Sequence, residues 1–326
     1  MSVFINPKID FAFKIIFGRE DSNDRLKSFL NAILYDAKPI IDKVTILNPY
    51  LPGDVDSMKE TYVDVQAGLE DGTSVIIEMQ MSMKPDFFKR MIYNVAKKYS
   101  AQLESGQYYN RLHPVIGLVV ADFVYPEAQS ANRPITKFAL LETTDHFRYP
   151  DPQDFQIIVV ELPKFGKALD QLENETDMWL FLLNYANQLQ EVPSQMTKVK
   201  EIQSAFEAAK EANLTPLELE ELEKRRFYAM SEQENLAWAR RDALEEGIER
   251  GIKQGLEQGI EQGIEQGVVQ SILSILGSKF GPVPESVESQ IKQLRSLEWL
   301  NDAAVQAATA ENLDAFLDWM KEKNLE

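Results

Sequence analysis

Two acidic residues, Asp64 and Glu78, lie in neighbouring segments of alternating polar and apolar residues, 61–69 and 74–83. The segments are joined by Glu70-Asp71-Gly72. A three-residue loop with glycine in third place is typical of a type I turn followed by a bulge, and it aligns Asp64 with Glu78 across a β-hairpin. A two-residue Asp-Gly loop would shift the alignment by one residue and separate the carboxylates onto opposite faces, so the predicted site depends on the longer loop.

Side-chain alternation supports the longer loop, because residues of like parity then share one face of the ribbon. The apolar face contains Val63, Val65, Ala67, Leu69, Val75, Ile77, Met79 and Met81. The polar face contains Tyr62, Asp64, Gln66, Glu78 and Gln80.

Facing carboxylates with no basic partner on the same ribbon face repel each other, and a bound divalent cation such as Mg²⁺ or Mn²⁺ removes that repulsion. Asp64, Glu78 and the main-chain carbonyl of Met79 supply three oxygen ligands, and water completes the coordination shell. Such a cation polarises a phosphoryl oxygen and lowers the pKa of bound water, which is the chemistry of phosphodiester hydrolysis. The competing interpretation is a solvated polar face of a sheet.

Helices and buried strands alternate around this hairpin. A capping residue, a proline and a closing glycine predict a helix over residues 6–18, in which Asp10 and Lys14 share a face. A second helix is predicted over residues 24–34. Short β-branched runs predict buried strands at residues 115–124 and 157–162, with a weaker candidate at 138–141.

A basic helix is predicted over residues 85–105. Its apolar stripe comprises Phe88, Ile92, Val95, Tyr99 and Leu103. Its remaining surface includes Lys89, Arg90, Tyr93, Asn94, Lys97 and Lys98. The basic residues can neutralise backbone phosphates, although an ordinary solvated helix face fits the same pattern equally well.

Beyond residue 164 the strand signal ends, and the sequence becomes helix-forming and charged through residue 243. Glycine then recurs at every fourth position, at Gly247, Gly251, Gly255, Gly259, Gly263 and Gly267, each followed by Ile, Leu or Val. Each glycine costs a helix about 1 kcal/mol relative to alanine. Close packing of this helix against a second copy offsets the cost and favours a homo-oligomer, whereas a tolerated repeat expansion would act as a linker.

Composition and charge exclude several classes of protein. The 326-residue chain is 44% hydrophobic, which excludes a disordered or fibrous protein, and it lacks cysteine and contains only two histidines, so any metal would bind carboxylates. No apolar run reaches the roughly 18 residues of a membrane span, and we expect a cytoplasmic protein. Residues 1–110 carry 13 basic and 15 acidic residues, so most of the net charge of -18 comes from the rest of the chain. The first third of the chain can therefore still present a basic surface to a nucleic acid.

Four ordered blocks across residues 4–166 resemble the recombination-promoting nuclease and transposase (Rpn) family of the PD-(D/E)XK nuclease superfamily. The blocks are residues 10–18, Tyr62-Val63-Asp64-Val65-Gln66-Ala67 with Ile77-Glu78-Met79-Gln80, Lys89-Arg90-Met91-Ile92-Tyr93 with residues 102–108, and Glu161-Leu162-Pro163-Lys164-Phe165. The resemblance implies an α/β, restriction-endonuclease-like mixed sheet flanked by helices and metal-dependent DNA cleavage.

The same resemblance assigns roles to single residues. It implies that Asp64 and Glu78 are the metal-binding acids and that Asp10 is the assisting acid of the first helix. Gln80 occupies the place that lysine holds in the wider superfamily, so the attacking water would be oriented by Gln80 or by a lysine from elsewhere, with Lys14 and Lys97 as candidates.

The resulting hypothesis is a divalent-metal-dependent DNA endonuclease linked to recombination or mobile elements, with DNA contacted by Lys89, Arg90, Tyr93, Lys97 and Lys98. We expect a nuclease-like core at residues 1–166, a helical extension at 167–245, a Gly-repeat helix at 246–270 and a C-terminal helical module at 271–326. The alternative is an inactive nuclease-fold protein that acts as a DNA- or protein-binding assembly module. The absence of any lysine amine near the Asp64 and Glu78 carboxylates in the fold would favour this alternative.

Overall fold

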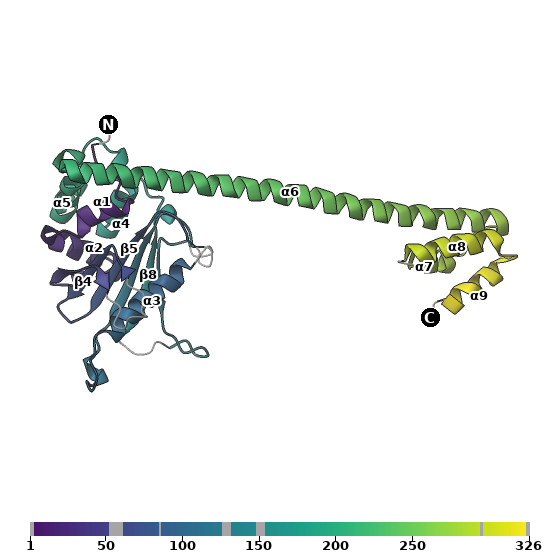
Figure 1. Cartoon of the computed structure of the whole chain (residues 1–326), viewed down its shortest axis with the longest axis horizontal. Helices are drawn as coiled ribbons and strands as arrows, with labels where there is room; N and C mark the ends of the chain where they lie inside the picture. Colours follow the sequence, from purple (N-terminus) through teal and green to yellow (C-terminus); the bar gives the residue numbers. More distant parts are fainter. Residues whose placement is uncertain are drawn as a thin grey trace. The chain divides into compact units, whose positions relative to one another are not determined.

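The computed structural model describes residues 3–51, 61–84, 86–125, 132–147, 154–293 and 296–323. It contains two compact units, Met1–Glu234 and Asn235–Glu326 (Figure 1). All the candidate catalytic residues lie in the first unit. Within the described residues, no helix combines the length and apolar character that crossing a membrane requires.

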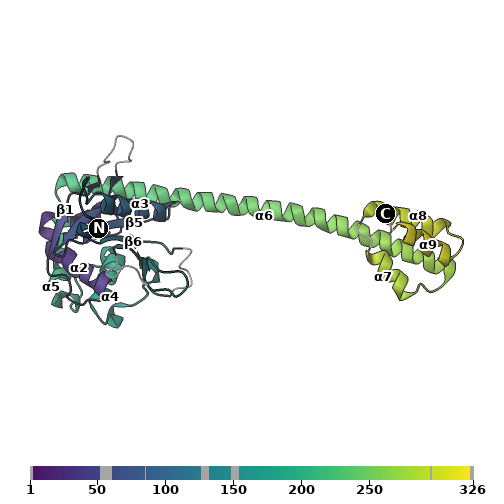
Figure 2. The same ribbon diagram turned by 90° about the horizontal axis from the view of Figure 1, so that it is seen from below.

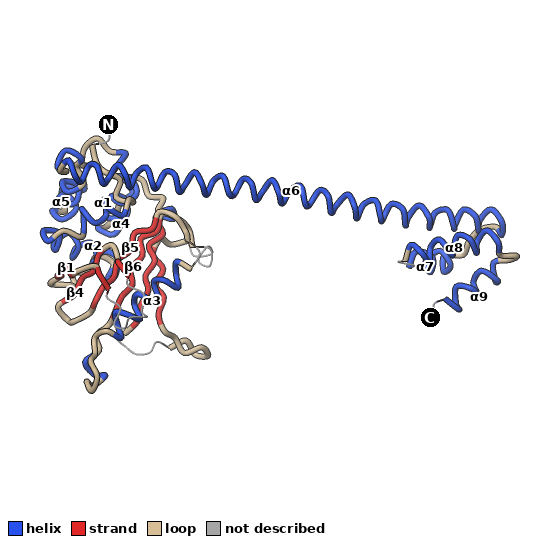
Figure 3. Tube along the Cα trace, viewed as in Figure 1, coloured by secondary structure: helices blue, strands red, loops and turns tan. Residues whose placement is uncertain are grey.

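A six-stranded mixed sheet forms the centre of the first unit, drawn in red in Figure 3. Its strands, in spatial order, are β1 (Val44–Leu47), β4 (Val65–Leu69), β5 (Ser74–Gln80), β6 (Val115–Ala121), β8 (Phe155–Glu161) and β7 (Ile135–Ala139). β5, β6 and β8 run parallel, and the other neighbours are antiparallel. A separate two-stranded ribbon pairs β2 (Tyr50–Leu51) with β3 (Thr61–Tyr62). The mixed α/β fold predicted from the sequence is therefore present, although β1 and β2 were not predicted.

Helices cover both faces of the sheet (Figure 2). One face packs against α1 (Asp10–Phe17), α2 (Asn23–Tyr35), α4 (Glu175–Tyr185) and α5 (Lys200–Ala208), and the opposite face packs against α3 (Phe87–Ser100). Alternate residues of one strand point into the two cores. Ile77 of β5 packs with the four-helix side, whereas Ile76 packs with α3.

The helical extension contributes to the same core as the sheet. Trp179 of α4 is fully buried, and its ring lies 5.6 Å from that of Phe17 and 5.7 Å from that of Phe29, between centroids. Leu222, near the start of α6 (Pro216–Phe280), is also buried in this core. The boundary predicted at residue 166 therefore does not divide the core, because residues beyond it complete the apolar face of α1 and α2.

The hairpin has the predicted register. Val65 pairs with Ile77 and Ala67 with Val75, and the Leu69 N–H donates to the Thr73 carbonyl at 2.8 Å. Gly72 has a φ of 89°, a conformation that glycine adopts without strain. The prediction of the three-residue loop is confirmed, and turn chemistry explains it.

The ladder ends sooner than expected. Regular pairing of β4 stops at Val65, and Asp64 lies in a bend between β3 and β4. Val63 packs with Ile76 in the α3-side core, so its predicted placement on the face of Val65 was wrong. The bend interrupts the alternation on which that placement rested. Of the stretch at residues 49–53 that precedes the hairpin, residues 52 and 53 lie outside the described residues.

α1 begins at Asp10 rather than at residue 6. The Asn6 side chain accepts a hydrogen bond from the Lys8 N–H at 3.1 Å and stabilises a turn before the helix. Capping residues stabilise turns as readily as helix starts, which is why the predicted start was early.

The apolar face of α3 differs from the prediction by about one residue position. Met91 and Val95 face the sheet, whereas Ile92 is 41% exposed. Both inward side chains lie over Gly117 of β6, where a Cβ atom would approach the Met91 sulfur and a Val95 methyl to 2.7 Å. The helix therefore sits where this glycine permits close approach, a contact that the helix sequence does not reveal.

The second unit is a small helical module. The end of α6 packs with α7 (Glu285–Gln293), α8 (Leu297–Thr309) and α9 (Leu313–Lys323) around Ile272, Leu276, Ile291, Leu300 and Phe316. The prediction of short helices after residue 271 is confirmed. The glycine repeat, residues 246–270, lies within α6.

Candidate active site

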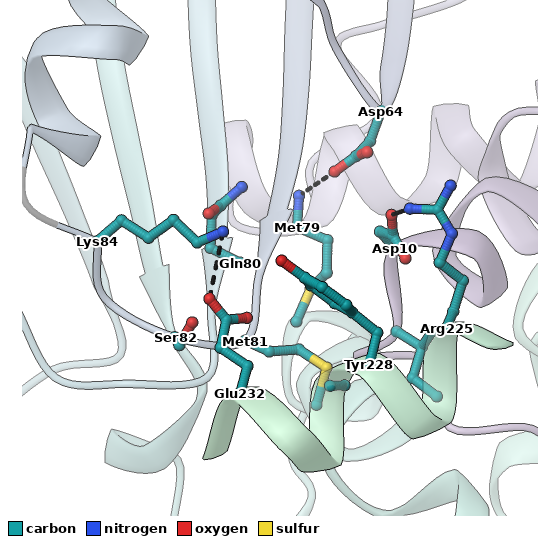
Figure 4. A pocket seen from close by; sticks show the side chains of 12 residues that line it. Asp10, Asp64, Met79, Gln80, Met81, Ser82, Lys84, Arg225, Tyr228 and Glu232 are labelled. Carbon is teal, nitrogen blue, oxygen red and sulfur yellow. Dashed lines mark hydrogen bonds and ion pairs between the residues drawn. The ribbon is translucent and has the colours of Figure 1, made fainter. Parts of the chain in front are cut away.

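A pocket of about 210 Å³ opens at the carboxyl end of β5 (Figure 4). Met79 and Gln80 line it from β5, Asp64 lines it from the bend before β4, and Asp10 lines it from the start of α1. The first turns of α6 close another side, where Arg225, Tyr228 and Glu232 line the same pocket. The pocket thus brings residues from the two ends of the first unit's sequence together with the hairpin.

Asp64 is held against the end of β5 by two groups. Its Oδ2 atom accepts a hydrogen bond from the Met79 N–H at 2.7 Å, and its Oδ1 atom lies 3.0 Å from the Lys14 amine. Burial raises the pKa of the Asp64 carboxyl, and the charge of Lys14 and the Met79 N–H oppose that rise. The carboxylate is therefore fixed in position beside a cation.

Glu78 lies beside the pocket and is only 6% exposed. The Gln80 amide donates to its Oε2 atom at 3.3 Å, and an Arg90 nitrogen lies 3.9 Å from the same oxygen. Burial, with the charge of Asp64 as the second cause, raises the pKa of Glu78 to about 7. Asp64 and Glu78 are therefore close enough to repel each other.

Asp10 completes a cluster of three carboxylates. Its charge adds to the rise in the pKa of Asp64, and its Oδ2 atom pairs with the Arg225 guanidinium at 2.9 Å. Each carboxylate thus has its own cation, because Lys14 pairs with Asp64 and Arg90 approaches Glu78. Lys14 belongs to α1, one turn after Asp10, as their predicted shared face requires.

The cluster fits a hard divalent cation by its donors. Among the described residues, no group of three or more His, Cys, Asp or Glu side chains is arranged to hold a metal, so the candidate ligands are the Asp64 and Glu78 carboxylates and the Met79 carbonyl. Burial raises the pKa of both carboxyls, and the charge of Asp64 adds to the rise at Glu78, so the pair carries unfavourable negative charge, which a cation offsets. Oxygen donors of this kind suit Mg²⁺ and Mn²⁺.

The proposed DNA contacts on α3 differ in their exposure. The Lys89 side chain is 83% exposed, Arg90 lies beside Glu78, and Tyr93 is at the surface. Lys98 is half-buried, and burial lowers the pKa of its amine.

Lys97 is in a different environment from its neighbours. It is 3% exposed and donates to the Leu51 carbonyl at 2.9 Å. The predictions that Lys97 contacts phosphate or replaces the motif lysine were therefore wrong, because the orientation of α3 directs this side chain against β2.

Among the pocket residues that were not predicted from the sequence, four are charged or aromatic: Lys84, Arg225, Tyr228 and Glu232. The last three lie on α6, more than 200 residues beyond Asp10 in the sequence, and Lys84 pairs with Glu232 at 3.3 Å. The only local signal is a basic triplet, residues 224–226, in an acidic segment.

Glu78 gives the metal-free protein a distinctive dependence of stability on pH. Its pKa of about 7 in the folded state exceeds its ordinary value of 4.5, so between these values the folded protein binds more protons than the unfolded chain. Stability should therefore fall as pH rises through this interval, by about 3 kcal/mol in total from this group, and Glu78→Gln should remove that fall. Urea denaturation in EDTA from pH 4.5 to 8 measures it. If the free energies of unfolding of wild type and variant differ by the same amount at every pH in this range, the prediction is contradicted.

Comparison with known proteins gives a match to one family model. Residues 7–239 match the family model of the PD-(D/E)XK nuclease family transposase, while no curated protein and no solved structure matches the chain. The matched region includes Asp10, Asp64 and Glu78, and it also includes α4, α5 and the start of α6, which complete the core. Because the match covers more than half of the sequence, the chain belongs to the PD-(D/E)XK nuclease family transposases.

Proposed function

We propose that the protein is a divalent-metal-dependent endonuclease that hydrolyses phosphodiester bonds in DNA. The observation that carries the proposal is the Lys14 amine, 3.0 Å from the Asp64 carboxylate. The sequence motif has Gln80 where the wider superfamily has lysine, and Lys14 supplies a cation to the same acids from α1. In an inactive assembly module Lys14 would only balance the charge of Asp64, and its replacement would then leave no catalytic effect to measure.

Each residue of the site has a proposed role. Asp64, Glu78 and the Met79 carbonyl would hold Mg²⁺ or Mn²⁺, which when bound polarises the phosphate and lowers the pKa of water. Gln80, which already hydrogen-bonds to Glu78, orients the attacking water. Lys14 stabilises negative charge that develops on the phosphate, because a preorganised cation in a partly buried site acts strongly on such charge. Asp10 assists by fixing the cations around the pocket.

DNA is the proposed substrate, and two basic residues on α3, the exposed Lys89 and the half-buried Arg90, are proposed to contact its backbone. Contacts of this kind position a duplex without reading its sequence. A role in recombination or in mobile elements follows from the transposase family alone.

The test of the function is cleavage of supercoiled plasmid by the purified full chain with Mg²⁺, Mn²⁺ or EDTA. Nicked and linear products that require the metal would support the proposal. Intact plasmid with either metal across pH 6–9 would contradict it and favour the assembly module.

The glycine repeat is proposed to mediate self-association. Five of the six apolar residues that follow its glycines are about half exposed or more: Ile248, Ile252, Leu256, Ile260 and Ile264. The sixth, Val268, packs against the core of the C-terminal helical module. Among the residues that the structure describes, a Cβ atom added at any of the six repeat glycines would meet nothing within 4 Å. The glycines therefore leave an open groove beside an apolar stripe, and a second copy of the helix would cover that stripe.

Replacing Gly251, Gly255, Gly259 and Gly263 together by alanine should abolish this association. Alanine raises helix propensity by about 1 kcal/mol per site, so the helix itself should be stabilised while the groove is filled. Light scattering coupled to size exclusion should show an oligomer for wild type and a lower mass for the variant. Equal masses, or a monomeric wild type at micromolar concentration, would indicate a linker.

A further inference from the structure

Arg225, on the first turns of α6, is fixed at the acidic cluster by two carboxylates. Its Nη1 atom lies 2.9 Å from Asp10, and its Nε atom lies 2.8 Å from Glu221 on its own helix. Figure 4 shows the guanidinium reaching from α6 to Asp10 at the edge of the pocket, on the side of Asp64. A residue remote in sequence thus lines the same pocket as Asp10 and Asp64.

The guanidinium retains donors for a further ligand. An arginine side chain has five N–H donors, and the two bonds to Asp10 and Glu221 use two of them. Glu221 chiefly, and Asp10 and Asp64 in addition, raise the pKa of Arg225, so the side chain is charged and lies within electrostatic range of Asp64. A planar fork held in this way suits the two non-bridging oxygens of a phosphodiester.

Anchoring of α6 does not explain why Arg225 is at this position. The helix is already attached to the core by buried Leu222 and by an ion pair between Arg19 and Glu218. The Arg225 side chain is 47% exposed and its Asp10 partner 33% exposed, and an ion pair this accessible to water contributes little to stability. The pair is therefore better suited to exchanging partners than to holding the fold.

We propose that Arg225 is a phosphate-binding residue of the active site, which holds the DNA phosphodiester beside Asp64. The proposal rests on the proposed nuclease function and extends it to α6. Asp10 orients the guanidinium before DNA binds, and a phosphate oxygen then shares or replaces that carboxylate. The first turns of α6 would in consequence form one wall of the substrate site.

The test compares Arg225→Gln with Arg226→Gln, its matched control. Arg226 is the next residue on the helix and pairs with Glu223 at 2.6 Å, but it does not line the pocket, so both variants lose one charge at nearly the same place. Binding of a fluorescein-labelled DNA duplex is measured by anisotropy in EDTA over a series of KCl concentrations. Cleavage with Mg²⁺ then gives KM and kcat, and thermal melting checks folding.

Arg225→Gln should weaken metal-free DNA binding about tenfold. It should reduce the slope of log affinity against log salt concentration by about one unit, the value for one phosphate contact, and it should raise KM in cleavage. Arg226→Gln should leave the affinity, the salt slope and KM near the wild-type values. Arg225→Lys should restore the salt slope and only part of the affinity, because lysine keeps the charge without the fork. Asp10→Asn, which releases the guanidinium, should tighten metal-free binding.

Equal affinity and salt slope for the Arg225→Gln and Arg226→Gln variants would overturn the proposal. Faster cleavage by Arg225→Gln would also overturn it, because the ion pair would then be a latch over the site. If wild type cleaves DNA and Asp64→Ala does not, either of these two results refutes the role of Arg225 and leaves the proposed nuclease function intact. If wild type does not cleave with any metal, the proposed function fails, while a selective loss of metal-free binding in Arg225→Gln would still support the phosphate contact.

Discussion

Replacing Asp64 or Glu78 by alanine should reduce metal-dependent DNA cleavage about a thousandfold or more. Loss of a ligand removes several kcal/mol of stabilisation of the transition-state charge, and each 1.4 kcal/mol corresponds to about tenfold in rate. The fold should persist, because both side chains belong to a repelling, partly buried acidic pair rather than to the apolar core. Plasmid cleavage under single-turnover conditions with Mg²⁺ and with Mn²⁺ measures the effect.

Asp64→Asn and Glu78→Gln serve as conservative variants that keep side-chain volume and hydrogen bonding. They should lose activity to a similar degree and melt at or above the temperature of wild type, since they remove repulsion. Cleavage within a few-fold of wild type by a folded alanine variant would exclude that residue from the metal site.

Lys14→Gln should lower the cleavage rate about a hundredfold. A cation or proton-transfer group positioned in the transition state contributes about 10² or more, and the motif itself has glutamine, Gln80, at the expected lysine position. Lys14 also lowers the pKa values of Asp64 and Glu78, so its loss should move the rise of activity with pH to higher pH.

The matched control is Lys27→Gln, on the neighbouring helix α2, where the amine lies 3.9 Å from Asp24 and outside the pocket. It should cleave like wild type. Unchanged activity and an unchanged pH profile for Lys14→Gln would show that Lys14 only balances the charge of Asp64.

Local sequence determined the hairpin and the identity of its acids. The loop sequence Glu70-Asp71-Gly72 favours one type of turn over the alternatives. That turn sets the register of every residue pair between β4 and β5, up to Val65 and Ile77. The buried strands β6 and β8 were likewise predicted, because β-branched runs have few alternatives to a strand between two helical layers.

Tertiary structure decided which cations meet these acids. The sequence named both Lys14 and Lys97 as substitutes for the missing lysine, and only packing distinguished them, since α3 settles over Gly117 and buries Lys97. The position of Asp64 likewise depends on an interaction between segments, because its carboxylate accepts a hydrogen bond from the Met79 N–H.

Arg225 shows the limit of sequence reasoning most clearly. It lies 215 residues from Asp10, on a helix whose start packs on the core through Leu222, and no periodicity or motif relates the two positions. Turns, registers and faces follow from interactions between residues close in the chain, so they can be predicted from it. Pairings between remote segments depend on how completed helices and sheets pack, and only the folded protein determines them.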